Sequence, residues 1–140
     1  MNIIKIFVFS FFLCFMANIR AQTINPKYLL FNTKKDNIVV FDIIKYYKID
    51  ENLFDINRYN QIDTISIKQL NKIKFSSVQK LWNQGRKETQ KYLKNLKKGT
   101  PILVNKTVIE TYNDLFKEIY IIEKLTNCKY KRTRVWWVDY

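Results

Sequence analysis

Lysines are the residues of this chain best placed for chemistry, because five of them recur at helical spacing between residues 77 and 98. At about 100° per residue, their side chains fall within about 40° of a common line on one face of the predicted helix. Glu88 is the one acid of this segment, so few of these ammonium groups have a carboxylate to pair with. Such a face can bind an anionic partner, for example lipid headgroups, an acidic cell-envelope polymer or an acidic protein patch. The members of this lysine stripe are Lys80, Lys87, Lys91, Lys94 and Lys98.

The lysine stripe also has a simpler interpretation, as the solvated face of a helix in a lysine-rich chain. Lysines outnumber arginines 20 to 5, and the formal net charge is +13. The charge is unevenly placed, because residues 22–63 hold six basic and six acidic residues whereas residues 68–98 hold ten basic residues and one acid. Specific nucleic-acid readout favours arginine, and Arg86 is the one arginine of the helix. We therefore expect no specific nucleic-acid partner.

Residues 129–137 interleave cations with aromatic side chains. This arrangement can stack bases or sugars and hold phosphates. The alternative is a β-strand in which one tryptophan is buried and the next one lies on the opposite face, because adjacent strand residues point to opposite sides. The candidate aromatic anchors are Trp136 and Trp137.

Catalytic and metal-binding chemistry has few candidates in this chain. It has no histidine, two cysteines and two glycines, which excludes histidine triads, histidine metal sites, cysteine zinc clusters and glycine-rich phosphate loops. The acids between residues 42 and 63 form no calcium loop and have no recognisable nucleophile beside them. We expect a protein that is not an enzyme and that uses no cofactor or metal. These acids, which we interpret as solubilising loop residues, are Asp42, Asp50, Glu51, Asp55 and Asp63.

The first 21 residues have the pattern of a signal peptide. A short basic start precedes an apolar run over residues 6–17 that is too short to span a bilayer core of about 30 Å. We expect cleavage between Ala21 and Gln22, with an uncleaved anchor as the alternative. The remaining residues 22–140 then form one domain, exported to the periplasm or secreted. Cys128 would be its single cysteine, which is buried, free or bridged to another chain; we favour burial.

Short β-branched and aromatic runs predict strands. Residues 28–31 and 38–41, separated by a polar connection, predict a β-hairpin. Residues 62–67 predict a third strand, and residues 135–138 predict a strand that closes the sheet. The region 46–59 fits either a loop or a further strand.

Two helices are predicted. The first covers residues 77–98, with Ser76 and Gln79 matching a capping box and Gly85 leaving a notch in its apolar face where a backbone could approach. The second covers residues 107–125, with a capping box at Thr107 and Glu110. Its expected buried stripe is Val108, Tyr112, Leu115, Ile119 and Ile122.

Together these patterns predict an α+β fold, in which a small antiparallel sheet made of the N-terminal hairpin and the C-terminal strand packs against two amphipathic helices. The function that we expect first is protein–protein binding by a small exported interaction protein. The alternative is a binder of polyanions or membrane surfaces that uses the basic face of the 77–98 helix. The expected partner is an unidentified protein under the first function and an anionic envelope surface under the alternative.

Overall fold

The structure is a computed structural model that describes residues 25–97 and 111–138. The expected signal peptide, Lys98 and the expected capping box at Thr107 and Glu110 lie outside these residues, as does Val108.

One eight-stranded mixed sheet dominates the described part of the chain. Its strands follow the order β2-β3-β4-β8-β7-β1-β6, and β5 pairs with β8 beside this path. The strands are β1 (Lys27–Phe31), β2 (Asn37–Phe41), β3 (Ile44–Ile49), β4 (Asn52–Asp55), β5 (Ile62–Ser66), β6 (Phe75–Ser76), β7 (Ile119–Lys124) and β8 (Lys129–Val138). The helices are α2 (Ile67–Leu70), α3 (Val78–Lys97) and α4 (Tyr112–Leu115). The expected fold, a small antiparallel sheet on two amphipathic helices, is therefore wrong.

The expected N-terminal hairpin is also wrong. β1 pairs in parallel with β7 and β6, and β2 pairs with β3 instead of β1. The connection between β1 and β2 closes on itself, because Asn32 O accepts from the amides of Lys35 and Asp36 while the Asp36 carboxylate accepts from Asn32 N at 2.7 Å. This turn leads the chain to the other half of the sheet.

Two tight turns produce the hairpins that do form. Asp42 and Ile43, between β2 and β3, have φ of 45° and 67°, and Asp50 and Glu51, between β3 and β4, have φ of 47° and 64°. Two consecutive residues with positive φ match the twist of the flanking strands, which is why such turns join antiparallel neighbours. The ambiguous region 46–59 therefore contributes strands β3 and β4.

The second predicted helix is mostly strand. Only Tyr112–Leu115 is helical, with a capping box formed by Thr111 and Asp114. Ile119 and Ile122 lie in β7, which is buried on both faces between β1 and β8. A strand with two buried faces shows a continuous apolar run without alternation, and over a few residues this run also fits a helical stripe.

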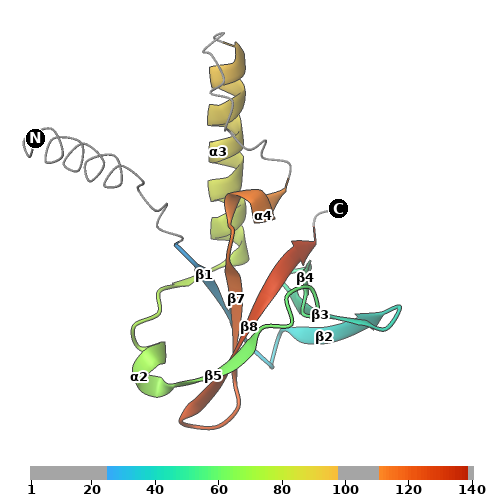
Figure 1. Ribbon diagram of the computed structural model, residues 1–140, viewed down its shortest axis with the longest axis vertical. Coiled ribbons are helices and arrows are strands. Elements are labelled where there is room, and N and C mark those ends of the chain that lie inside the picture. The colour runs from blue at the N-terminus through green and yellow to red at the C-terminus, as the bar shows by residue number, and fades with distance from the viewer. Residues whose placement is uncertain (1–24, 98–110, 139–140) are drawn as a thin grey trace, which may run out of the picture.

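α3 extends along the long axis of the molecule, with the sheet at its N-terminal end (Figure 1). Its range agrees with the predicted helix, but its cap is different. Ser77 Oγ accepts from Lys80 N at 3.2 Å, whereas Ser76 belongs to β6 and the Gln79 side chain donates to Asn83. The helix is capped by Ser77, one residue after the expected position, and the expected capping box at Ser76 and Gln79 is wrong.

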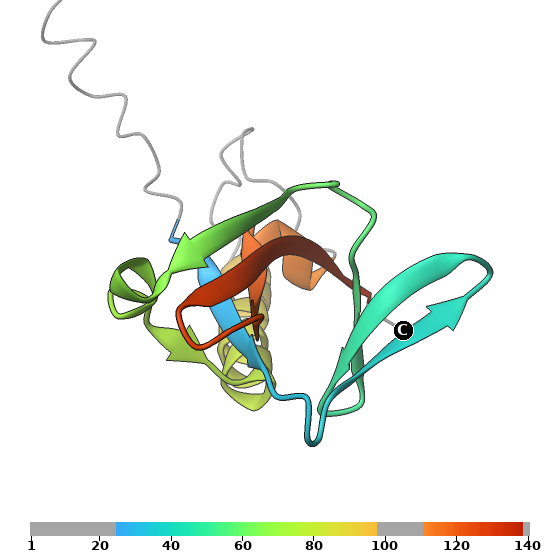
Figure 2. The ribbon, with the colours of Figure 1, turned by 90° about the horizontal axis from the view of Figure 1, so that it is seen from below.

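β8, the predicted closing strand, is long enough to pair with three others: β7 on one side, and β4 and β5 on the other. Figure 2 shows the sheet curving around β8 while the β2–β3 hairpin extends sideways from the body. The main core lies between one face of the sheet and the first turns of α3. Its most buried large side chains include Trp137, Tyr47, Phe54, Leu29, Leu81, Ile119, Ile121 and Val135.

Candidate functional site

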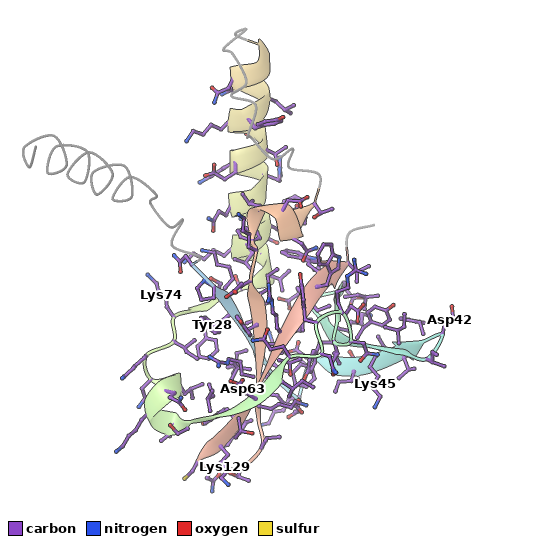
Figure 3. All side chains as sticks on the ribbon, in the orientation of Figure 1. Tyr28, Asp42, Lys45, Asp63, Lys74 and Lys129 are labelled. Carbon is purple, nitrogen blue, oxygen red and sulfur yellow. The ribbon has the colours of Figure 1, made fainter. Side chains whose placement is uncertain are left out.

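The first turns of α3 anchor this helix to the body. Val78 and Leu81 are 3% and 1% exposed, and Gly85 is buried. From Arg86 to Asn95 no side chain of the helix is buried. More than half of α3 therefore stands clear of the sheet, as the side chains around it in Figure 3 show.

The notch at Gly85 holds an aromatic ring. A Cβ at Gly85 would lie 2.8 Å from Cδ1 of Tyr112 and closer still to Cε1. Tyr112 in turn stacks on Trp137, with 4.5 Å between ring centroids. Because Gly85 has no side chain, the ring of Tyr112 in α4, stacked on Trp137 in β8, can pack against the base of α3. The notch is therefore occupied by a side chain and not, as expected from the sequence, by a backbone.

The lysine stripe lies on the opposite side of α3 from this anchor. Lys80, Lys87, Lys91 and Lys94 are exposed, and Lys98 lies outside the described residues. Within residues 25–97 and 111–138, no ion pair joins any of these four lysines to an acid. The described part of the stripe therefore presents four uncompensated ammonium groups to solvent.

A second cationic surface, here called the cation–aromatic belt, consists of Arg58, Tyr59, Arg134 and Trp136. The Arg58 guanidinium lies 5.1 Å from the ring centroid of Trp136, and that of Arg134 lies 4.2 Å from the ring of Tyr59. The rings of Tyr59 and Trp136 are 6.2 Å apart. These contacts between cations and rings hold the loop after β4 against β8.

The two candidate aromatic anchors, Trp136 and Trp137, lie on opposite faces of β8, as adjacent strand residues do. Trp137 is 2% exposed and packs against Phe54 in the core, whereas Trp136 is partly exposed on the other face, in the belt. Trp136 is thus the accessible member of the pair.

Sequence reasoning missed the role of the arginines. Each arginine in the described ranges lies over an aromatic ring: Arg86 over Trp82 at 4.8 Å and Arg132 over Tyr120 at 5.4 Å, besides the two in the belt. The planar guanidinium stacks on rings better than a lysine ammonium does. In the sequence, only the scarcity of arginine in a lysine-rich chain could have indicated that the arginines have a specific role.

A cluster of three ionisable groups, of which Tyr47 is buried and Glu123 and Lys131 are partly buried, lies at the junction of β3, β7 and β8. Lys131 Nζ pairs with Glu123 Oε2 at 2.5 Å, and the Tyr47 hydroxyl donates to the same carboxylate oxygen at 3.0 Å. Burial raises the pKa of Tyr47. Burial lowers the pKa of Lys131, but hydrogen bonds with Glu123 and Tyr47 outweigh it and raise that pKa overall. These groups satisfy one another, which is the arrangement of a structural cluster.

The acids do not converge on a site. Asp42 and the pair Asp50 and Glu51 occupy the two hairpin turns, and Asp63 accepts from the guanidinium of Arg132. This contact is the first cause of a raised pKa of Arg132. In the described ranges, no group of three or more acidic or cysteine side chains could hold a metal ion. Cys128 is exposed in the β7–β8 loop, so its expected burial is wrong; a four-residue connection leaves its side chain no core to enter.

Comparison of the chain with protein-family models, with curated proteins and with solved structures gives no significant match. None of the helices in the described ranges is long and apolar enough to cross a membrane.

Proposed function

We propose that the protein is a non-enzymatic binding protein that acts after export and attaches to an anionic surface or polymer through the lysine stripe. The observation that supports this most directly is the position of Lys80, Lys87, Lys91 and Lys94 on a helix that projects from the body. A helix that serves only solubility usually mixes the two signs of charge. Here the exposed face carries one sign.

The geometry of the stripe suits a repeated anion. From Lys80 to Lys94 the helix advances about 21 Å, at 1.5 Å per residue. Lysine ammonium groups on flexible stems neutralise phosphate or carboxylate groups without demanding a fixed orientation. A row of such groups therefore fits a lipid headgroup surface or an acidic polymer better than a single small anion.

The test is a salt titration of binding to heparin and to liposomes that contain anionic lipid. The variant Lys87→Gln/Lys91→Gln/Lys94→Gln keeps helix propensity and the opposite, anchored face. Each lysine near an anionic surface contributes about 1 kcal/mol, so we expect roughly a 100-fold loss of affinity at low salt. Binding to heparin alone would identify a polymer, and binding to the liposomes alone would identify a lipid surface.

A matched control separates the stripe from net charge. Lys34→Gln/Lys45→Gln/Lys68→Gln removes the same charge from exposed positions on other elements. When both variants are compared at about 0.1 M salt, the control should lose less than about threefold, because charges beyond a Debye length of about 10 Å are then screened. Equal losses in both variants, or no binding by the parent at low salt, would contradict the proposal.

Protein–protein binding, the second candidate, is favoured by a different surface. Ile38, Val40, Phe41 and Ile43 on the β2–β3 hairpin are 45%, 58%, 55% and 93% exposed. Such an apolar group on one projecting element suits a protein partner better than a polyanion.

A further inference from the structure

Three strands of the sheet have an unpaired side among the described residues. β6 (Phe75–Ser76) has only two residues, and β5 (Ile62–Ser66) carries the charged Asp63, whereas β2 has five residues, Asn37–Phe41. β2 contains no charged residue and no proline. Edge strands that remain unpaired are usually protected by such residues or by a bulge. β2 therefore has the properties of a strand that pairs with another chain.

The hydrogen-bonding groups of β2 that face outward can be assigned from the register. Lys45, opposite Val40, uses its carbonyl to accept from Ile56 N at 3.2 Å, on the side of β4. Bonded and non-bonded pairs alternate along an antiparallel ladder. Val40 and, two residues earlier, Ile38 therefore direct their N–H and C=O groups away from β3.

The turn residue Ile43 strengthens the case for an occupant. Its side chain is 93% exposed and its φ is 67°, a region that β-branched residues disfavour. Glycine or asparagine would suit this backbone better. The positive φ serves the turn between β2 and β3. The exposed apolar side chain of Ile43 is a surface that a protein partner would cover.

We propose that β2 pairs antiparallel with β2 of a second copy of this chain, about a two-fold axis at Val39. Ile38 of each copy then lies opposite Val40 of the other copy. The N–H and C=O groups of these residues, which point away from β3, form four hydrogen bonds between the copies. In the same register Val39 lies opposite Val39 of the second copy, so the three central residues of β2 meet apolar side chains, while Phe41 lies opposite Asn37. The segment is thus complementary to itself, as a two-fold interface requires.

The distribution of charge favours this surface for contact between copies. Residues 22–63, which include the hairpin, hold equal numbers of basic and acidic residues, whereas residues 68–98 carry the excess of lysine and arginine. Asp42 and Lys45 mark the outer part of the hairpin, far from α3 (Figure 3). Pairing through β2 therefore keeps the two lysine stripes apart.

The interface is small, because it consists of one five-residue strand pair and the turn beside it. Contacts below about 1,200 Å² are characteristic of weak association. We expect a dimer that forms at tens of micromolar concentration. If the proposed function holds, such a dimer carries two lysine stripes and binds a polyanion with avidity. The dimer itself does not depend on that function.

Sedimentation equilibrium of the purified protein between about 5 and 300 µM tests the proposal. The average mass should rise toward twice the monomer mass of 17.0 kDa. Val40→Lys places a charge at the two-fold interface and should keep the protein monomeric over the whole range. Ile62→Lys, which adds the same charge at a residue 53% exposed on β5, should leave the dimer unchanged.

A cross-linking measurement covers the case in which Val40→Lys disturbs the hairpin. With Cys14 and Cys128 replaced by serine, Val39→Cys places two thiols at a non-hydrogen-bonded pair on the two-fold axis, where Cα atoms lie about 4.5 Å apart and a disulfide can form. It should form dimers at least tenfold faster than Ile62→Cys under the same oxidant. A constant monomer mass up to 300 µM, or equal cross-linking of the two variants, would overturn the proposal.

Discussion

Asn113 is a buried side chain that replaces a missing strand beside β8. β7 pairs with β8 only as far as Val135, so on that side the backbone of Trp137 has no strand partner among the described residues. Asn113 Nδ2 donates to Trp137 O at 2.7 Å, and Trp137 N donates to Asn113 Oδ1 at 2.9 Å. The amide thus provides the donor and the acceptor that a strand would provide.

Asn113→Ala should lower the free energy of unfolding by about 2 to 4 kcal/mol, because it leaves two buried backbone groups without partners. Urea denaturation measures this loss. Asn83→Ala, at an exposed position of α3, is the matched control and should change stability by less than about 0.5 kcal/mol. A similarly small effect of Asn113→Ala would show that the Trp137 backbone is satisfied without this side chain.

Tyr112 and Gly85 act together at the level of elements, because they join α4 to α3. The Tyr112 ring lies between Gly85 and Trp137, so it has no free space into which to withdraw. The orientation of the projecting helix, and with it the direction of the lysine stripe, depends on this contact.

Gly85→Leu should lower the free energy of unfolding by about 1 to 3 kcal/mol, because the added side chain overpacks the contact with Tyr112. Thermal denaturation provides the measurement. Gln84→Leu, at the exposed neighbouring position, should have a much smaller effect. In a double-mutant cycle, Tyr112→Ala should reduce the effect of Gly85→Leu. A Gly85→Leu variant as stable as the parent would mean that this face of α3 is open.

The stability of the whole molecule should depend on pH in the alkaline range. The pKa values of Tyr47 and Tyr120 are raised, in both cases first of all by burial, and that of Lys131 is raised overall by its hydrogen bonds despite burial. At pH above about 10 the unfolded chain has lost protons that the folded chain still holds. The free energy of unfolding must then decrease as pH rises, since the folded state binds more protons.

Tyr47→Phe should make this decrease shallower, although the lost hydrogen bond to Glu123 also lowers stability by about 1 kcal/mol at neutral pH. Urea denaturation at a series of pH values between about 8 and 11 measures the slope. The double variant Tyr47→Phe/Tyr120→Phe should have a still smaller slope of the free energy of unfolding against pH. A variant without Tyr47 and Tyr120 whose slope equals that of the parent would contradict the assignment.

The whole molecule presents its two unusual surfaces in different directions. α3 extends along the long axis, and the β2–β3 hairpin extends sideways from the sheet (Figures 1 and 2). The basic surface and the apolar surface can therefore be occupied at the same time. This separation is what allows a polyanion and a second copy to be tested independently.

The sequence by itself determined the local features. The range of α3, the face that carries the lysines and the strand at residues 135–138 follow from periodicity, which is set by the geometry of a single element. The placement of Trp136 and Trp137 on opposite faces follows from the same alternation, but which of the two is buried does not. These features need no information about which segments become neighbours.

Only the tertiary structure decided which strands pair. The parallel pairing of β1 with β7 joins segments about 90 residues apart and buries β7 on both faces, which removed the alternation that identifies a strand. The burial of Asn113, the ring seated on Gly85 and the stacking of the arginines depend on the same long-range neighbours. The open edge at β2 also appears only when the strand order is known, because an edge is defined by the strand that is not there.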